Sequence, residues 1–102
     1  MYARLTKIKG TPETINGSIN EYRDLTIPNV EKMAGFAGAF FLVQRETGQM
    51  LSITLWDSEK DMRDTETLAN RLRSQAAQTA SSNQLPEVER YEVALMPQEI
   101  RA

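Results

Sequence analysis

Neither cysteine nor histidine occurs in this sequence of 102 residues. The lack of cysteine excludes disulfide bonds, thiolate catalysis and zinc–thiolate sites. The lack of histidine removes the commonest metal ligand, the commonest general base and the imidazole ligand of haem. We therefore expect neither a metal nor haem, and no other cofactor, so that any chemistry depends on other side chains or on the substrate itself.

The sequence also lacks a long apolar run and a concentration of positive charge. No segment approaches the roughly 20 apolar residues of a membrane-spanning helix, and the first ten residues are typical of a strand rather than of a signal peptide. Basic residues are scattered and the net charge is −2, which does not suit binding to a nucleic-acid backbone. The sequence predicts one domain (1–102) of a cytoplasmic protein that binds neither membranes nor nucleic acid.

The clearest structural signal is a β-hairpin in GFAGAFFLVQRETGQMLSITLWDSE, residues 35–59. Residues 37–43 are nearly all apolar, and residues 50–56 alternate between apolar and more polar side chains. Thr47 and Gly48 between them suit a tight turn. Ser58 then has the side chain of a helix N-cap.

Strands and helices alternate over the rest of the chain. The predicted order is a strand at 2–9, a helix at 11–27, the hairpin strands at 37–43 and 50–56, a helix from Ser58 to about Thr79, and a strand at 87–96. This β-α-β-β-α-β order predicts an α+β, ferredoxin-like plait, with a four-stranded antiparallel sheet and two helices on one face. We expect the tail after Pro97 to be loose.

The strand at 37–43 is apolar on both faces, which two helices on one face of a sheet do not explain. Either Phe40 and Leu42, or Phe41 and Val43, would face water in a monomer. Full exposure would forgo about 1.5–3 kcal/mol for each large apolar side chain. The pattern therefore predicts a homodimer that packs through its sheets.

Two segments of the sequence resemble the antibiotic biosynthesis monooxygenases, a family of dimeric α+β barrels. They are GFAGAFFLVQRETGQMLSITLWDSEKD and VERYEV, and the element order extends the resemblance over most of the chain. The resemblance implies a cofactor-independent oxygenase, in which an electron-rich aromatic such as a quinol or polyphenol donates an electron to O₂ inside a dry pocket. The alternatives are a non-catalytic protein that binds a small molecule in the same cavity, and a structural module whose cavity is filled by its own side chains.

The resemblance also places Trp56 where such oxygenases carry a Trp at the end of the third strand. The candidate substrate-binding residues are those that we expect near it, in the space between the sheet and the helices: Trp56, Ser52, Thr54, Arg4, Tyr22 and Phe36. Four of the six have a simpler explanation as well. Trp56 and Tyr22 suit core aromatics, Phe36 suits a hydrophobic plug, and Arg4 suits an ion pair with Glu89 or Glu92.

Neither a functional role for Arg71 and Arg73 nor haem degradation is expected. We expect Arg71 and Arg73 to be solvated charges on a helix surface. The haem-degrading relatives resemble this chain in the hairpin, but the residues on which they depend correspond to positions near Ala3, Thr65 and Gln75, and none of the three matches. Haem degradation by that scheme is therefore not expected.

Overall fold

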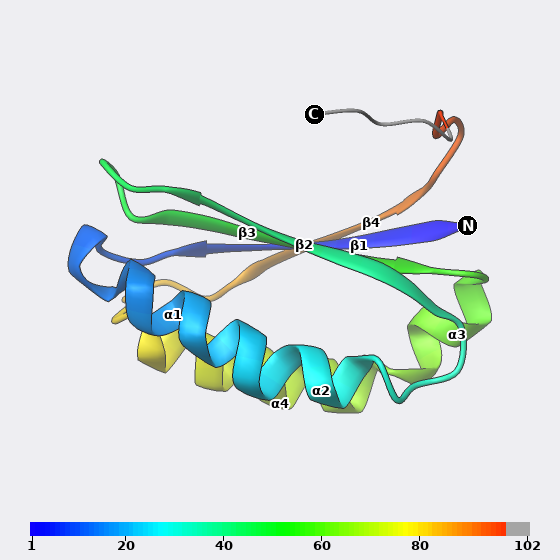
Figure 1. The fold of residues 1–102 in the computed structure, drawn as a ribbon, viewed down its shortest axis with the longest axis horizontal. Coiled ribbons are helices and arrows are strands. Elements are labelled where there is room, and N and C mark those ends of the chain that lie inside the picture. The colour runs from blue at the N-terminus through cyan, green and yellow to red at the C-terminus, as the bar shows by residue number, and fades with distance from the viewer. Residues whose placement is uncertain (98–102) are drawn as a thin grey trace.

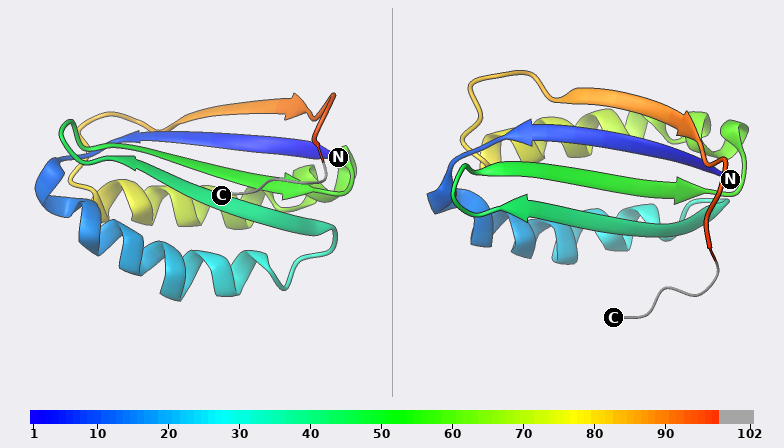
Figure 2. Two further views of the ribbon diagram at one scale, coloured as in Figure 1. Left: turned by 45° about the horizontal axis from the view of Figure 1, so that its top comes forward. Right: turned by 90° about the horizontal axis from the view of Figure 1, so that it is seen from above.

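The computed structural model describes residues 1–97, which form a four-stranded sheet covered by helices. The strands are β1 (Tyr2–Lys9), β2 (Phe36–Gln44), β3 (Gln49–Trp56) and β4 (Glu87–Glu92), and the α-helices are α1 (Ile15–Glu21), α2 (Ile27–Val30), α3 (Glu59–Asp64) and α4 (Glu66–Thr79). The sheet order is β2-β3-β1-β4 with every pair antiparallel. Figure 1 shows α1, α2 and α4 on the same side of the sheet, and Figure 2 shows the four strands side by side. The predicted ferredoxin-like α+β fold is confirmed.

The hairpin and its exit follow the local rules that the sequence indicated. Gly48 has a φ of +81°, which the turn between β2 and β3 requires. An added Cβ there would lie 2.6 Å from the carbonyl carbon of Thr11. Ser58 accepts a hydrogen bond from the backbone N–H of Asp61 at 3.1 Å, so it caps α3 as predicted.

The first helical region continues beyond its predicted end near residue 27. A 3-10 turn (Pro12–Thr14) leads into α1, and a π-helical segment (Tyr22–Thr26) joins α1 to α2. Pro28 is the second residue of α2 and has no backbone N–H to donate to the preceding π-helical segment. The side-chain amide of Asn29 donates to the carbonyl of Leu25 at 2.7 Å, and the helical region continues through Pro28 to the end of α2 at Val30.

The second helical region is broken, whereas the sequence predicted one helix over 58–79. Thr65 separates α3 from α4 with φ −94° and ψ 3°. Its hydroxyl donates to the carbonyl of Met62 at 2.7 Å, and a side-chain bond of this kind competes with the helical backbone pattern. The last strand also differs, because β4 ends at Glu92 rather than at 96.

The two faces of the sheet differ sharply in cover. On the helix side, one buried cluster contains Ile8, Ile15, Met50 and Ala80, and a second contains Val30, Trp56 and Met62. On the other side, Phe40 and Leu42 are 51% and 48% exposed, so this is the face on which the apolar side chains of β2 lie in the open. We call this second side, with Phe40, Leu42, Leu51, Ile53 and Leu55, the open face.

Candidate functional site

Arg4 lies on the central strand β1 and points toward the helices. Its side chain is only 4% exposed. Nη1 donates to the Met62 carbonyl at 3.0 Å and to Oε1 of Glu66 at 2.6 Å, and Nη2 donates to the Thr65 hydroxyl at 3.0 Å. Burial lowers the pKa of Arg4, and the pairing with Glu66 opposes that effect. Arg4 thereby ties the sheet to the break between α3 and α4.

The ion-pair partner that the sequence suggested for Arg4 was wrong. Arg4 pairs with Glu66, because both residues lie on the helix side of the sheet. Glu89 lies opposite Leu5 in the register, one position away from Arg4, and therefore on the open face. There it pairs with Lys7 at 3.0 Å.

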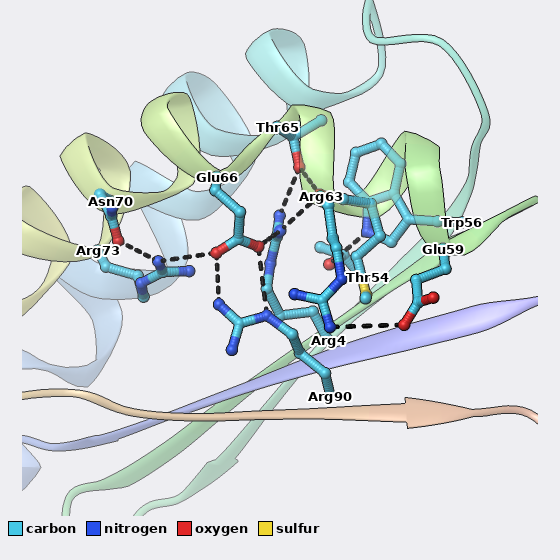
Figure 3. A network of polar contacts seen from close by, with 11 residues as sticks. Arg4, Thr54, Trp56, Glu59, Arg63, Thr65, Glu66, Asn70, Arg73 and Arg90 are labelled. Carbon is cyan, nitrogen blue, oxygen red and sulfur yellow. Dashed lines mark hydrogen bonds and ion pairs between the residues drawn. The ribbon is translucent and has the colours of Figure 1, made fainter.

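Glu66, the first residue of α4, is shared by three arginines. Arg4 comes from β1, Arg73 from α4 and Arg90 from β4, and all three approach its carboxylate (Figure 3). Burial alone would raise the pKa of Glu66, but hydrogen bonds from Arg90 and Arg4 hold it below its usual range. The carboxylate is therefore ionised at pH 7 and carries the one negative charge among these four side chains.

A cavity of about 60 Å³ lies next to this cluster, between the sheet and the helices. Its lining combines hydroxyl groups, two guanidinium groups and apolar walls: Arg4, Thr6, Ile8, Tyr22, Thr26, Val30, Phe41, Ser52, Thr54, Ala69, Leu72, Arg73 and Ala76. Pockets for drug-sized ligands measure roughly 300–1,000 Å³. The cavity of this conformation therefore admits a group of a few atoms rather than a whole aromatic molecule.

Tyr22 closes the cavity from the first helical region. Its ring stacks on Phe41 with 4.5 Å between centroids and 17° between planes. Its hydroxyl lies 2.8 Å from Oγ of Ser52 on β3. Burial raises the pKa of Tyr22, and the hydrogen bond with Ser52 opposes part of that rise, so the phenol is neutral at pH 7. It begins the π-helical segment, and segments of this kind are frequent at functional sites.

Trp56 lies in the core beside the cavity rather than in its lining. It is fully buried, and its indole N–H donates to Oγ1 of Thr54 at 2.9 Å. The ring of Phe36 meets it edge-on at 5.7 Å, and Cζ of Arg4 lies 5.6 Å from its centroid. Trp56 thus contacts two residues of the lining, Thr54 and Arg4.

Four of the six predicted site residues line the cavity, namely Arg4, Tyr22, Ser52 and Thr54. Trp56 and Phe36 pack together at its side. Whether any of the six contacts a ligand stays a prediction.

Sequence reasoning missed other lining residues. Thr6 alternates with Arg4 on β1, so the strand period was a usable signal for it. Arg73 was wrongly expected to be a solvated charge, because its side chain is only 12% exposed. Its spacing of four residues from the inward-facing Ala69 was the signal for Arg73.

Within residues 1–97, no three acidic side chains gather into a group that suits a metal ion. Over the same residues, every helix is too short or too polar to cross a bilayer.

Comparison with solved structures finds close agreement over nearly the whole chain. The monooxygenase ActVA-Orf6 of Streptomyces coelicolor, solved in complex with nanaomycin D, superposes with a TM-score of 0.75 at 14% identity, over 95% of this chain and 92% of its own. SnoaB, a cofactor-independent oxygenase of Streptomyces nogalater, gives 0.62 at 15% identity, over 96% and 95%. The chain has the fold of the antibiotic biosynthesis monooxygenases. A further antibiotic biosynthesis monooxygenase gives 0.66 at 15% identity, over 93% of this chain and all of its own.

Comparison by sequence finds relatives without an assigned role. No protein-family model matches the chain. The uncharacterized protein Rv2557 of Mycobacterium tuberculosis H37Rv is 28% identical over 102 residues, which is all of this chain and 45% of that protein. Rv2558 of the same strain is 27% identical over 96 residues, which is 94% of this chain and 40% of that protein. The chain thus spans less than half the length of the curated relatives that it matches.

Proposed function

We propose that this protein is a cofactor-independent monooxygenase that oxidises an electron-rich aromatic substrate, such as a quinol or polyphenol. The observation that carries the proposal is the cavity under the sheet. Aromatic, hydroxyl and guanidinium groups converge there from β1, β2, β3 and two helical regions. The two Streptomyces oxygenases share the fold over more than nine-tenths of both chains, which supports the same general use of this space.

The reaction needs little from the protein beyond binding and orientation. A phenol and O₂ give a quinone and water, with one oxygen atom becoming the new carbonyl and the other leaving as water. The substrate supplies all the electrons. The protein has to hold the aromatic ring away from bulk water and to stabilise the anion that reduces O₂.

The lining provides charge stabilisation rather than a strong base. Arg4 and Arg73 are cations, and Tyr22 is a neutral phenol at pH 7. A cation near a phenol favours its ionised form and lowers its pKa. We propose that the substrate ionises on binding beside these arginines and that its proton leaves to solvent. Trp56 acts as a positioning residue, because its indole N–H orients the hydroxyl of Thr54.

The volume of about 60 Å³ requires the cavity to widen before an aromatic ring enters. The wall that we propose to move is the π-helical segment with Tyr22 and Thr26, because segments of this kind are frequent at functional sites. The small volume also favours a second candidate function. In that reading the protein binds a smaller molecule and catalyses nothing.

The open face supports a homodimer within the same proposal. Phe40, Leu42 and Tyr91 are about half exposed there, and a row of aliphatic side chains on β3 lies beside them. A second copy packed on this face would remove that apolar surface from water. Each subunit would then keep its own cavity on the helix side.

The test is a ligand screen followed by a turnover assay. Quinols, flavonoids and polyketide-like aromatics are tested for a thermal shift, and a ligand at 100 times its Kd should stabilise the fold by about 2.7 kcal/mol. Hits are assayed for oxygen uptake by protein treated with a chelator. Tyr22→Phe keeps the ring on Phe41 but removes the hydroxyl, so turnover should fall, whereas Tyr91→Phe on the open face is the matched control. Ligand binding without oxygen uptake would favour the second candidate function.

A further inference from the structure

The cluster beside the cavity holds more positive than negative charge. Among residues 1–97, Arg4, Arg73 and Arg90 all make their ion pairs with one carboxylate, that of Glu66. These pairs are unequal. Arg4 bonds Glu66 at 2.6 Å and Arg90 bonds it directly, whereas Nη2 of Arg73 lies 3.9 Å from its Oε2. Arg73 is therefore the least neutralised of the three.

Arg73 also has an unused donor. Its Nη2 donates to the side-chain oxygen of Asn70. Its Nη1 is buried, and no protein atom within residues 1–97 accepts a hydrogen bond from it. A buried cationic donor without an acceptor is costly, and such groups are rare in folded proteins. A negatively charged acceptor in the cavity would accept a hydrogen bond from this donor and would also offset the excess positive charge of the cluster.

The rest of the lining suits the same kind of group. No Asp or Glu lines the cavity, so nothing in it repels an anion. Thr54 accepts its hydrogen bond from Trp56, which leaves its own hydroxyl proton free to be donated into the cavity. Thr6 on the neighbouring strand offers a further hydroxyl. The volume of about 60 Å³ matches a group of a few heavy atoms.

We infer that the cavity binds a carboxylate group, held by Nη1 of Arg73 and by the hydroxyls of Thr54 and Thr6. The remaining walls, among them Ile8, Phe41 and Leu72, are apolar, so the ligand that carries this carboxylate is an apolar or aromatic monocarboxylic acid. The inference rests on the proposed function only in that both place a ligand in this cavity. It does not require that the ligand is oxidised.

Acetate and acetamide provide the direct test, because they share size and shape and differ in charge. Each is titrated into the ¹⁵N-labelled protein at constant ionic strength set with sodium chloride, and the backbone amide signals of β1 and β3 are followed. Acetate should shift these signals saturably, and acetamide should not. Sulfate serves as a tetrahedral dianion of a different class and should bind at least tenfold more weakly than acetate.

The variants separate Arg73 from general surface charge. Arg73→Met removes the charge but keeps the length of the side chain, and it should raise the Kd of acetate at least tenfold. Arg71→Met, on an exposed position of the same helix, should leave that Kd unchanged. Arg73→Lys keeps the charge but loses the planar fork of donors, and an intermediate Kd is expected. This variant also tests the inference if Arg73→Met does not fold.

Three results would overturn the inference. They are equal binding of acetate by the wild type and Arg73→Met, equal binding of acetamide and acetate, and tighter binding of sulfate than of acetate. Saturable acetate binding that depends on Arg73, together with no oxygen uptake on any aromatic hit, would uphold the inference and refute the proposed oxygenase.

Discussion

Removing the charge of Glu66 should show how much its pairing with the buried Arg4 contributes to the free energy of unfolding. In Glu66→Gln, Arg4 keeps neutral acceptors at Met62 and Thr65 but stays 96% buried without a counter-ion. Breaking a fully buried pair in this way costs about 3–5 kcal/mol. The Glu66 side chain is 27% exposed, and solvent there lowers the expected loss to about 2–3 kcal/mol. That is a large share of the roughly 5–15 kcal/mol by which a domain is stable.

Urea unfolding followed by tryptophan fluorescence is the appropriate assay. Trp56 is the only tryptophan in the chain and is fully buried, so its emission reports exposure of this core. Glu59→Gln is the matched control, because it removes an exposed pair with Arg63 and should cost under about 0.5 kcal/mol. In an Arg4→Met background, Glu66→Gln should cost under about 1 kcal/mol, since only the partly exposed pairs remain. Equal losses for Glu66→Gln and Glu59→Gln would refute this reasoning.

The pKa of Glu66 is lowered in the folded state, so its stabilising effect is complete above the unfolded pKa of about 4.5 and is lost as pH falls through the folded pKa. Between pH 6 and pH 3 the free energy of unfolding should therefore fall more in the wild type than in Glu66→Gln, and an equal fall in both proteins would contradict this. Phe41→Asp should unfold or strongly destabilise the chain, by about 3 kcal/mol or more, because Phe41 packs on Tyr22. Phe40→Asp on the open face should instead leave folding intact and shift the protein from dimer to monomer in light scattering. A wild-type monomer of about 12 kDa would refute the dimer proposal. Trp56→Phe removes a buried hydrogen bond to Thr54 and should cost about 1–2 kcal/mol in urea unfolding followed by circular dichroism, since this variant has no tryptophan to report by fluorescence; an unchanged midpoint would show that the bond contributes nothing.

The fold was predictable because several local signals agree with one another. Gly48 allows the turn, Ser58 caps the helix that follows, and the alternation of 50–56 puts one set of side chains on each face. The element boundaries were harder to predict. The helix around Pro28 depends on a π-helical register, and the break at Thr65 depends on a hydroxyl that bonds Met62 and on Arg4, which comes from a distant strand.

The site was predictable only in part, for a related reason. Strand alternation places Ser52, Thr54 and Arg4 on the helix side, and the helix period does the same for Tyr22. The partner of Arg4 was not predictable, because Glu66 lies 62 residues away and looks like an ordinary exposed acid in the first turn of a helix. Arg73 was missed because its charge was given more weight than its spacing of four residues from the inward-facing Ala69. Only the packed structure shows that three arginines converge on one carboxylate.

Oxygen consumption by the purified chain tests the central claim most directly. Protein treated with a chelator and freed of small molecules is mixed with a phenolic or quinol ligand that the thermal-shift screen has identified, and oxygen uptake and product are measured together. We expect one O₂ consumed for each quinone formed from a phenol, no effect of the chelator, and a slower rate in Tyr22→Phe with no change in Tyr91→Phe. A rate no higher than that without protein, for every ligand that binds in the cavity, would contradict the claim.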